Sequence, residues 1–369
     1  MNSLRVVFRV DASIGLGSGH VMRCLTLADE IKAGGGECLF ICLAQEGSFL
    51  GYIRQRGFLA HGIEAYSSNM SIMDQDSSDS INDWVKDAEQ TKDCIGEAIV
   101  DWLIVDHYGL DARWEQLMRP ICRYLMVIDD IANRPHFCDV LIDQNYEHEE
   151  RYKLLVPLSC QLLLGPRFAL LRPEFIKYRN FLNQRAKSIK KVFIFFGGSD
   201  PHDLTKMALQ ALSVPELNHL EINIVVGQNY AYYESLHQLA IYRGKTQVHG
   251  PRNHLADLMA SSDIAIGAGG VTNWERICLG LPSIVITLAE NQIPICEILH
   301  RQGFIRLLGK SEDVTLNEIK NAMLDEVQCY RLFDSISSSM EICDGHGVSR
   351  VLKVMTSYHT VNDLNPNSI

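Results

Sequence analysis

Residues 263–276 read Asp-Ile-Ala-Ile-Gly-Ala-Gly-Gly-Val-Thr-Asn-Trp-Glu-Arg, and this stretch decides the fold class. The apolar run 263–266 is typical of a strand buried on both faces, and the glycines after it predict a turn that opens a helix. Because glycine has no Cβ atom, backbone N–H groups at the positive helix start can approach a diphosphate. The pattern also fits a plain tight turn, so the rest of the chain must decide its meaning.

Two more loops of the same kind occur in the chain. Residues 192–194 form an apolar run that leads into the glycine loop 195–201, Phe-Phe-Gly-Gly-Ser-Asp-Pro. Near the N-terminus, residues 6–10 predict a strand, residues 11–20 a glycine-rich turn, and residues 21–31 an apolar helix. Three strand-to-glycine-turn units in one chain are more than chance predicts, and such a turn can hold a phosphate.

Strands and helices alternate along the whole chain. The apolar runs that predict strands are 6–10, 38–43, 102–105, 124–128, 140–142, 192–196, 222–226, 263–266 and 284–286. Helical stretches lie between many of them, which is typical of parallel sheets with helices on both faces. We therefore expect an α/β fold with two doubly wound, Rossmann-like domains that face a cleft.

The pattern restarts near Lys190, after a basic, polar stretch. This places an N-terminal domain at 1–180, a C-terminal domain at 190–355 and a polar tail at 356–369. Residues 344–355 predict a glycine-started helix that packs on either domain. Residues 67–89 are rich in Ser, Asp and Asn, and we interpret them as a surface excursion, either a lid or a variable solvated loop.

Composition restricts the classes of partner. The chain has 369 residues, 47% of them hydrophobic, and a net charge of -11, so it lacks the basic surface that nucleic-acid binding needs. Its eleven cysteines are scattered without a C-x-x-C pair, which favours a reducing cytoplasm. Neither a signal peptide nor an apolar run of ~18 residues is present, so we expect no membrane span. The oligomeric state stays open.

Polar residues follow several of the predicted strands directly. His20 begins a helix, where the positive helix end favours a neutral imidazole that can accept a proton, although it also fits a histidine that only packs on the helix. Asp106, His107 and Tyr108 follow the strand 102–105, at the end where ligands bind in open α/β sheets. Asp129 and Asp130 follow the strand 124–128, and we interpret Asp130 as structural.

In the second half, Glu275 lies one turn into the helix after Gly270. A carboxylate there can accept hydrogen bonds from both hydroxyls of a ribose, or it can simply complement the helix dipole. Asn291 and Gln292 follow the strand 284–286, where amides can hold sugar hydroxyls or an N-acetyl group. No cluster has the spacing of a metal site, so we predict no metal and no cofactor.

These residues belong to an ordered series of motifs running from about residue 5 to 352. The motifs are Arg9-Val-Asp11, Gly15-Leu-Gly17-Ser-Gly19-His20-Val-Met-Arg23-Cys24-Leu, Asp106-His-Tyr108, Ile128-Asp-Asp130, Cys138-Asp139, Asp143-Gln-Asn145, Gly165-Pro166, Leu170-Leu-Arg172, Phe196-Gly-Gly-Ser-Asp200, Gly267-Ala-Gly-Gly270, Trp274-Glu-Arg276 and Glu290-Asn-Gln292. The series resembles the UDP-2,4-diacetamido-2,4,6-trideoxy-β-L-altropyranose hydrolases of pseudaminic acid biosynthesis. That family is similar in fold to the UDP-N-acetylglucosamine transferase of peptidoglycan synthesis, which implies a glycosyltransferase-B architecture.

The resemblance implies that water attacks the anomeric carbon of a UDP-linked sugar and releases UDP with inversion. It assigns catalytic roles to His20, Tyr108 and Asn291, with His20 activating or positioning the water. The substrate-binding residues that it implies are Asp11, Gly17, Gly19, Gly198, Ser199, Gly269, Gly270, Val271, Thr272, Glu275 and Gln292. Of these, Glu275 and the turn 267–270 match the nucleotide side, and Gly198 and Ser199 flank the same phosphates.

Three rival functions fit parts of this pattern. A glycosyltransferase would share the fold and the UDP site and would replace water with a sugar or lipid acceptor. A non-catalytic nucleotide-sugar binding protein would need the turn 267–270 but not His20, Tyr108 and Asn291 together. A 2-epimerase of similar fold would change the configuration at C2 of the sugar.

Overall fold

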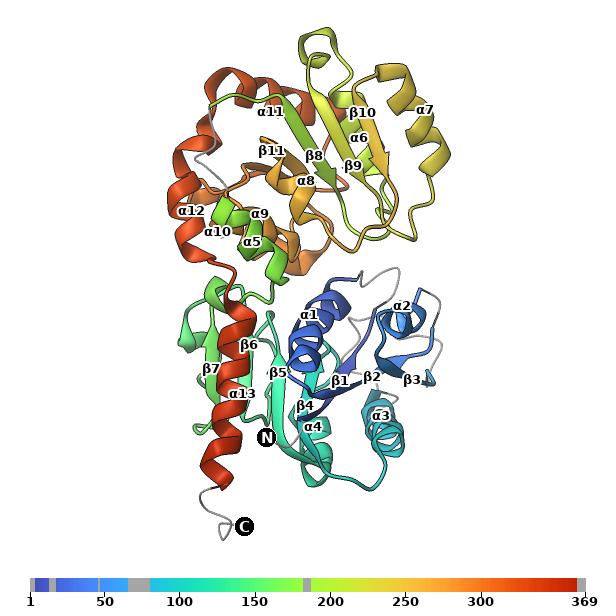
Figure 1. The fold of residues 1–369 in the computed structure, drawn as a ribbon, viewed down its shortest axis with the longest axis vertical. Coiled ribbons are helices and arrows are strands. Elements are labelled where there is room, and N and C mark those ends of the chain that lie inside the picture. The colour runs from blue at the N-terminus through green and yellow to red at the C-terminus, as the bar shows by residue number, and fades with distance from the viewer. Residues whose placement is uncertain (1–3, 13–17, 46, 66–79, 182–186, 364–369) are drawn as a thin grey trace. The chain divides into compact units, whose positions relative to one another are not determined.

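The computed structural model describes residues 4–12, 18–45, 47–65, 80–181 and 187–363. The chain divides into two compact units (Figure 1): unit 1 is Met1–Leu170 with His346–Ile369, and unit 2 is Leu171–Gly345. This division differs at two helices from the expected boundaries of 1–180 and 190–355. Helix α5 (Pro173–Phe181) belongs to unit 2, and helix α13 (Gly347–Asp363) belongs to unit 1.

Unit 1 contains a seven-stranded sheet in the order β3-β2-β1-β4-β5-β6-β7, with every neighbouring pair parallel. The strands are β1 (Arg5–Val10), β2 (Glu37–Leu43), β3 (Leu59–Ile63), β4 (Val100–Asp106), β5 (Cys122–Ile128), β6 (Val140–Asp143) and β7 (Gln161–Leu164). The other helices of the unit are α1 (Gly19–Ala33), α2 (Leu50–Gln55), α3 (Ser80–Ile95) and α4 (Ala112–Met118), with 3₁₀ turns η1 (Arg119–Ile121), η2 (Glu149–Arg151) and η3 (Pro166–Phe168).

Helices bury both faces of this sheet. Phe8 of β1 packs in a cluster with residues of α1, α2 and α13, whereas its neighbour Val7 packs on the opposite face with residues of α3 and α4. Because successive side chains of a strand point to opposite faces, a strand covered on both sides is apolar at most of its positions. Helix α13, drawn in red in Figure 1, contributes the buried Val351 and Met355 to the first of these faces.

Part of the expected surface excursion is a packed helix. Residues 66–79 lie outside the described residues, but residues 80–89 belong to α3, so the prediction of a surface loop over 67–89 is wrong for its second half. In α3, Trp84 packs against the core at its edge, and Ala88 and Ile95 are buried in it. This spacing of four and seven residues is helical, but the polar residues between these positions conceal it.

Unit 2 contains a six-stranded parallel sheet in the order β10-β9-β8-β11-β12-β13. The strands are β8 (Lys191–Phe195), β9 (Glu221–Val225), β10 (Thr246–His249), β11 (Ile264–Ala268), β12 (Ser283–Thr287) and β13 (Arg306–Lys310). The helices that follow α5 are α6 (Leu204–Ala211), α7 (Tyr233–Arg243), α8 (Ala256–Ala260), α9 (Thr272–Cys278), α10 (Ile293–Arg301), α11 (Leu316–Cys329) and α12 (Ile336–Ile342), with 3₁₀ turns η4 (Pro215–Leu217), η5 (Glu290–Gln292) and η6 (Arg331–Ser335).

Both sheets reverse their strand order in the middle. In unit 1 the chain builds outward from β1 to β2 and β3, then returns to β4 on the other side of β1; in unit 2 the corresponding pair is β8 and β11. Ligands of open α/β sheets bind beyond the carboxyl ends of the strands at such a reversal. The two parallel sheets confirm the predicted α/β fold class. In each unit, the loops at the strand reversal are where we look for a ligand site.

Within the described ranges, the helices that the structure contains are all too short or too polar to cross a membrane.

Candidate functional site

The site in unit 1 lies at the carboxyl ends of β1, β4 and β5. Asp106 is the last residue of β4 and pairs in register with Val10 of β1. His20 is the second residue of α1, the helix that follows β1 in the chain, and its Nδ1 atom lies 2.6 Å from Oδ1 of Asp106. Residues that are 86 positions apart in sequence therefore form a histidine–carboxylate pair, which we call the His20–Asp106 dyad.

Arg23 connects this dyad to a second carboxylate. It lies three residues after His20, so both side chains share one face of α1. Its Nε donates to Oδ2 of Asp106 and its Nη2 to Oδ1, each at 2.6 Å, and its Nη1 donates to Oδ2 of Asp130 at 3.1 Å. His20, Arg23, Asp106, Tyr108 and Asp130 form one connected group, which we call the His20 cluster.

The charge on Asp106 determines which nitrogen of His20 carries the proton. Burial alone would raise the pKa of Asp106, but the Arg23 guanidinium and then His20 hold that pKa well below its usual range. An ionised Asp106 accepts the Nδ1 proton of His20, and the guanidinium nearby, 3.1 Å from Nδ1, has no lone pair to accept it. This tautomer leaves the lone pair on Nε2, where an imidazole acts as a general base.

Tyr108 packs directly against His20. The two rings meet edge to face, with centroids 4.7 Å apart and an interplanar angle of 87°. The Tyr108 hydroxyl donates to Oδ1 of Asp130 at 2.8 Å, and burial, followed by the charge of Asp130, raises its pKa, so the phenol stays neutral. The structure thus places the predicted catalytic residues His20 and Tyr108 side by side, and their catalytic roles stay predictions. Asp130, interpreted from the sequence as structural, joins them through Tyr108 and Arg23.

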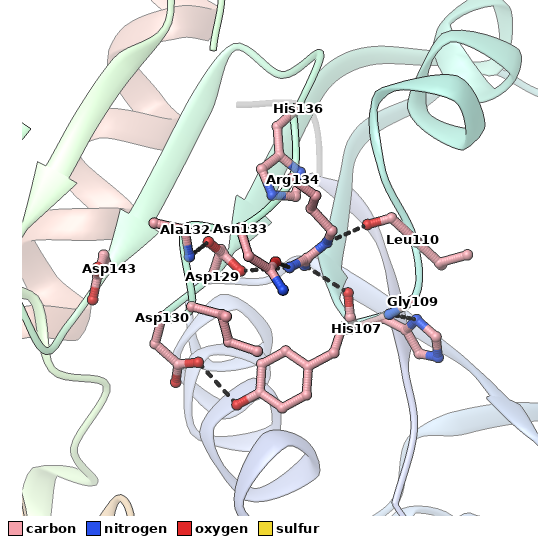
Figure 2. A network of polar contacts seen from close by, with 12 residues as sticks. His107, Gly109, Leu110, Asp129, Asp130, Ala132, Asn133, Arg134, His136 and Asp143 are labelled. Carbon is pink, nitrogen blue, oxygen red and sulfur yellow. Dashed lines mark hydrogen bonds and ion pairs between the residues drawn. The ribbon is translucent and has the colours of Figure 1, made fainter. Parts of the chain in front are cut away.

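The loops that carry Tyr108 and Asp130 are held together by Arg134 (Figure 2). Its Nε donates to the carbonyl of Leu110 at 2.9 Å, its Nη2 to the carbonyl of His107 at 3.0 Å, and its Nη1 to Oδ1 of Asp129 at 2.9 Å. Arg134 is itself buried, and it crosses from the loop after β5 to the loop after β4. It therefore sets the separation of the loops that bring Tyr108 to Asp130.

Asp11 is the least available of the predicted binding residues in unit 1. Its oxygens accept from Arg9 at 2.6 and 3.0 Å, from the Leu43 N–H at 2.7 Å, and from Nε2 of His107 at 3.1 Å. Burial would raise its pKa, but Arg9 holds the pKa far below the usual range. Asp11 thus ties β1 to the neighbouring strands, and a direct role in binding stays a prediction, as does that of Gly19 at the start of α1. Gly17 lies outside the described residues.

In unit 2 the candidate site is the glycine turn, residues 267–272, which joins β11 to α9. Two of its glycines are required by packing: a Cβ atom on Gly267 would lie 2.4 Å from the carbonyl oxygen of Phe195, and one on Gly269 would lie 2.5 Å from Sγ of Cys296. The Gly269 N–H donates to the carbonyl of Ile286 at 3.2 Å. Within the described residues, the next three N–H groups, up to Thr272, have no hydrogen-bond acceptor.

Glu275 follows this turn and is buried, with one carboxylate oxygen paired. Its Oε1 accepts from Nη2 of Arg172 at 3.1 Å, while Oε2 is buried without a partner among the described residues. Burial raises the pKa of Glu275, and Arg172 opposes that shift. Arg172 also donates to the carbonyl of Asn253, so it holds Glu275 beside the loop that precedes α8. A buried carboxylate oxygen without a donor is suited to a ligand hydroxyl.

The other predicted residues of unit 2 surround the same strand ends. Oε1 of Gln292, in η5, accepts from the Leu288 N–H at 2.9 Å, and its amide lies against the glycine turn, 3.5 Å from the Cβ position of Gly270. Gly198 follows β8, and its carbonyl accepts from the Asn229 N–H at 3.2 Å. The ligand roles of Gly198, Ser199, Asn291 and Gln292 stay predictions.

The sequence interpretation did not assign Arg23, Asp106 or Asp130 to the candidate site. It placed Asp106 at a strand end without pairing it with His20, because only the order β1-β4 in the sheet brings them together. Arg23 was noted only as part of a motif. Its spacing of three residues from His20 was the available signal, since such residues share one helix face.

Comparison with known proteins identifies distant relatives. No family model matches the chain. It is 26% identical over 303 residues to the UDP-2,4-diacetamido-2,4,6-trideoxy-β-L-altropyranose hydrolase of Campylobacter jejuni, which is 82% of this chain and 98% of that protein. It is 25% identical over 376 aligned positions to the uncharacterized protein MJ1062 of Methanocaldococcus jannaschii, covering 98% and 71% of the two chains. The spore coat polysaccharide biosynthesis protein SpsG of Bacillus subtilis is 25% identical over 260 residues, 69% of this chain and 76% of SpsG.

Solved structures establish the fold. MurG of Acinetobacter baumannii superposes with a TM-score of 0.62 at 12% identity, over 96% of this chain and 99% of MurG. The calicheamicin glycosyltransferase CalG4 gives 0.61 at 12% identity, over 97% and 98%. UGT71G1 of Medicago truncatula, solved with UDP-glucose, gives 0.58 at 10% identity, over 96% and 98%. The chain has the glycosyltransferase-B fold.

Proposed function

We propose that this protein hydrolyses a UDP-linked 2,4-diacetamido-2,4,6-trideoxy sugar at its anomeric carbon and releases UDP and the free sugar with inversion, as a step of pseudaminic acid biosynthesis. A water molecule is the nucleophile, and His20 is its general base. The reaction uses no metal ion.

The observation that carries the proposal is the His20–Asp106 dyad. With Nδ1 donating to Asp106 at 2.6 Å, Nε2 takes one proton from the water as its oxygen bonds to C1. The bond between C1 and the phosphate oxygen breaks, and its electron pair leaves with UDP. The imidazolium that forms is stabilised by the ionised carboxylate of Asp106, as in other histidine–carboxylate pairs. One base on the face opposite the leaving group is sufficient for inversion.

The leaving group is assigned to unit 2. The N–H groups of the glycine turn that lack protein acceptors would hydrogen-bond to the diphosphate and stabilise the charge that develops on it. Glu275, with its unpartnered Oε2, would accept from the ribose hydroxyls. UDP is a good leaving group once this charge is stabilised, so the mechanism needs no general acid.

One relative supports this choice of reaction over others on the same fold. The Campylobacter jejuni protein is named for this hydrolysis, and the match covers 98% of its length, so both units are represented in it.

The proposal also accounts for His20, Tyr108 and Asp106 together, whereas a protein that only binds nucleotide sugars has no need of a histidine–carboxylate pair. A 2-epimerase would act at C2 rather than C1.

A glycosyltransferase that uses a UDP-sugar donor is the second candidate. The specific observation in its favour is the fold, since the superposing structures include proteins named as glycosyltransferases and one solved with UDP-glucose. A base at Nε2 of His20 would serve equally well to deprotonate an acceptor hydroxyl. The two functions differ in whether turnover requires an acceptor.

The test is turnover of UDP-2,4-diacetamido-2,4,6-trideoxy-β-L-altropyranose in ¹⁸O-labelled water without any acceptor, followed by mass spectrometry of the UDP. We expect UDP release with no ¹⁸O in the UDP, because water attacks carbon and not phosphorus. His20→Ala should lower the rate by ~10²-fold or more while UDP binding is retained. Labelled UDP, or release that depends on an added acceptor, would refute the hydrolysis at C1.

A further inference from the structure

Unit 2 contains a buried cation directly beneath the glycine turn. Arg276, in α9, has a relative exposure of 1%, and its Nη2 donates to the carbonyl of Ala268 at 2.8 Å and to Oδ1 of Asn273 at 2.5 Å. Its Nη1 donates to Oγ1 of Thr272 at 3.4 Å. These acceptors belong to the glycine turn and the first turn of α9, so the guanidinium packs against the inner side of the turn.

This guanidinium has no ion-pair partner in the described part of the chain. The adjacent carboxylate, Glu275, is committed to Arg172 at 3.1 Å, and Nε of Arg276 is buried without an acceptor. Burial lowers the pKa of Arg276 to about 10, so the side chain still carries its charge at neutral pH. A buried charge without a counter-charge is costly to the folded protein, and it favours any anion that can approach it.

The packing of β11 shows how close the charge lies to the turn. A Cβ atom on Gly267 would be 2.8 Å from Nη1 of Arg276, so the glycine admits the guanidinium to the end of the strand. In the same segment, the N–H groups of Gly270, Val271 and Thr272 have no acceptor among the described residues. The turn therefore combines backbone donors that have no protein acceptor with a buried positive charge next to it.

A second arginine of unit 2 shows the arrangement of a guanidinium with a purely structural role. Arg243, the last residue of α7, also has no carboxylate partner among the described residues, but all three of its nitrogens are hydrogen-bonded. Nε donates to the carbonyl of Leu212 at 3.2 Å, Nη1 to that of Leu220 at 3.1 Å and Nη2 to that of Leu217 at 2.9 Å. Arg243 lies before the amino end of β10, whereas the glycine turn follows the carboxyl end of β11.

We propose that Arg276 is the counter-charge for the diphosphate of UDP: a positioning residue that acts through the glycine turn without contacting the ligand. The inference rests on the proposed function, because it takes UDP as the ligand of unit 2. The inference means that Arg276 makes unit 2 select for ligand charge, so it favours a nucleoside diphosphate over the uncharged nucleoside. Glu275, in contrast, recognises the ribose that both ligands share.

The experiment measures the affinities of UDP and uridine, by calorimetry and ligand-observed NMR, for the wild-type protein and for Arg276→Met, Arg276→Lys and Arg243→Met. In Arg276→Met we expect UDP affinity to fall by about tenfold or more and uridine affinity to change by less than about threefold, because the Coulomb attraction between the buried charge and the diphosphate is lost. Arg276→Lys keeps the charge and should retain most of the preference for UDP. Arg243→Met should leave the ratio of the two affinities unchanged.

Several outcomes would overturn the inference. Equal losses of UDP and uridine affinity in Arg276→Met would show that the arginine only supports the turn. A loss of selectivity in Arg276→Lys of about tenfold or more would assign the effect to hydrogen bonds rather than to charge, and this variant alone decides the question if Arg276→Met does not fold. A wild-type protein that binds neither ligand would instead refute the proposed function. Wild-type UDP binding matched by Arg276→Met refutes only the role of Arg276.

Discussion

Nδ1 of His20 lies 2.6 Å from Oδ1 of Asp106, and both oxygens of this carboxylate also accept from Arg23 at 2.6 Å. The arrangement holds the imidazole in one orientation and in one tautomer, with its lone pair on Nε2. It exists because β1 and β4 are neighbours in the sheet: Asp106 ends β4, and His20 belongs to α1, the helix that follows β1 in the chain. The predictions below start from this relationship.

Asp106→Asn should lower kcat by ~10²-fold or more, because a neutral amide can bind either tautomer and does not stabilise the imidazolium. UDP affinity should be unchanged, since the residues predicted to hold UDP belong to unit 2. Asp139→Asn is the matched control. Asp139 also pairs with an arginine, Arg119, at 2.8 Å, but it lies at the amino end of β6, whereas the His20–Asp106 dyad lies at the carboxyl ends of the strands. A kcat for Asp106→Asn equal to that of this control would remove the dyad from the mechanism.

Tyr108→Phe removes the hydroxyl that donates to Asp130 and keeps the ring packed on His20. We expect a loss of about 1 kcal/mol in the free energy of unfolding and a fall in kcat/KM of about tenfold or more. Tyr124→Phe loses a comparable bond, from its hydroxyl to the carbonyl of Tyr358 at 2.9 Å, and should lose stability alone. Steady-state kinetics and urea unfolding of both variants separate the effects. Full activity in Tyr108→Phe would make its hydroxyl purely structural.

Glu275→Gln should weaken the binding of UDP and of uridine by similar factors, about tenfold, because both ligands contain the ribose. The variant keeps the shape of the side chain but has one acceptor oxygen in place of two. Calorimetry with 2′-deoxy-UDP sharpens the test. Removing the 2′-hydroxyl should cost the wild-type protein more affinity than it costs the variant. Equal costs would show that Glu275 does not bind this hydroxyl.

Asp143→Asn should change how stability depends on pH. Burial raises the pKa of Asp143 to about 7, although the Asn145 N–H and Arg151 favour its ionised form. An unfolded Asp has a pKa of about 3.9, so the folded protein binds more protons between about pH 4 and 7, and its stability falls as pH rises through that range. Urea unfolding should therefore show the stability of the variant, relative to wild type, increasing from pH 5 to pH 8. A constant difference would contradict the raised pKa.

The sequence predicts the interior of both sheets better than their edges. All the strands missed in the sequence analysis lie at the ends of the strand orders: β3 and β7 in unit 1, and β10 and β13 in unit 2. An edge strand has one neighbour and a more exposed face, so it does not need a continuous apolar run. β3 illustrates this, because its Leu59 is 70% exposed and its His61 and Gly62 are also exposed.

The candidate site is predictable where it depends on local pattern. His20, Tyr108, Glu275 and the glycine turn follow strand ends or begin helices, and sequence shows both features. The contacts between them depend on topology: Asp106 reaches His20 across 86 residues, and Asp130 reaches Tyr108 across 22. The buried charge of Arg276 was not foreseen, because charged residues at this position of a helix are usually solvated.

The most direct test of the account is proton NMR of the purified protein with UDP-2,4-diacetamido-2,4,6-trideoxy-β-L-altropyranose and no acceptor, recorded before the free sugar mutarotates. The account predicts prompt formation of UDP and of the free sugar with the inverted anomeric configuration. A free sugar of retained configuration, or substrate that stays intact until an acceptor is added, would contradict it.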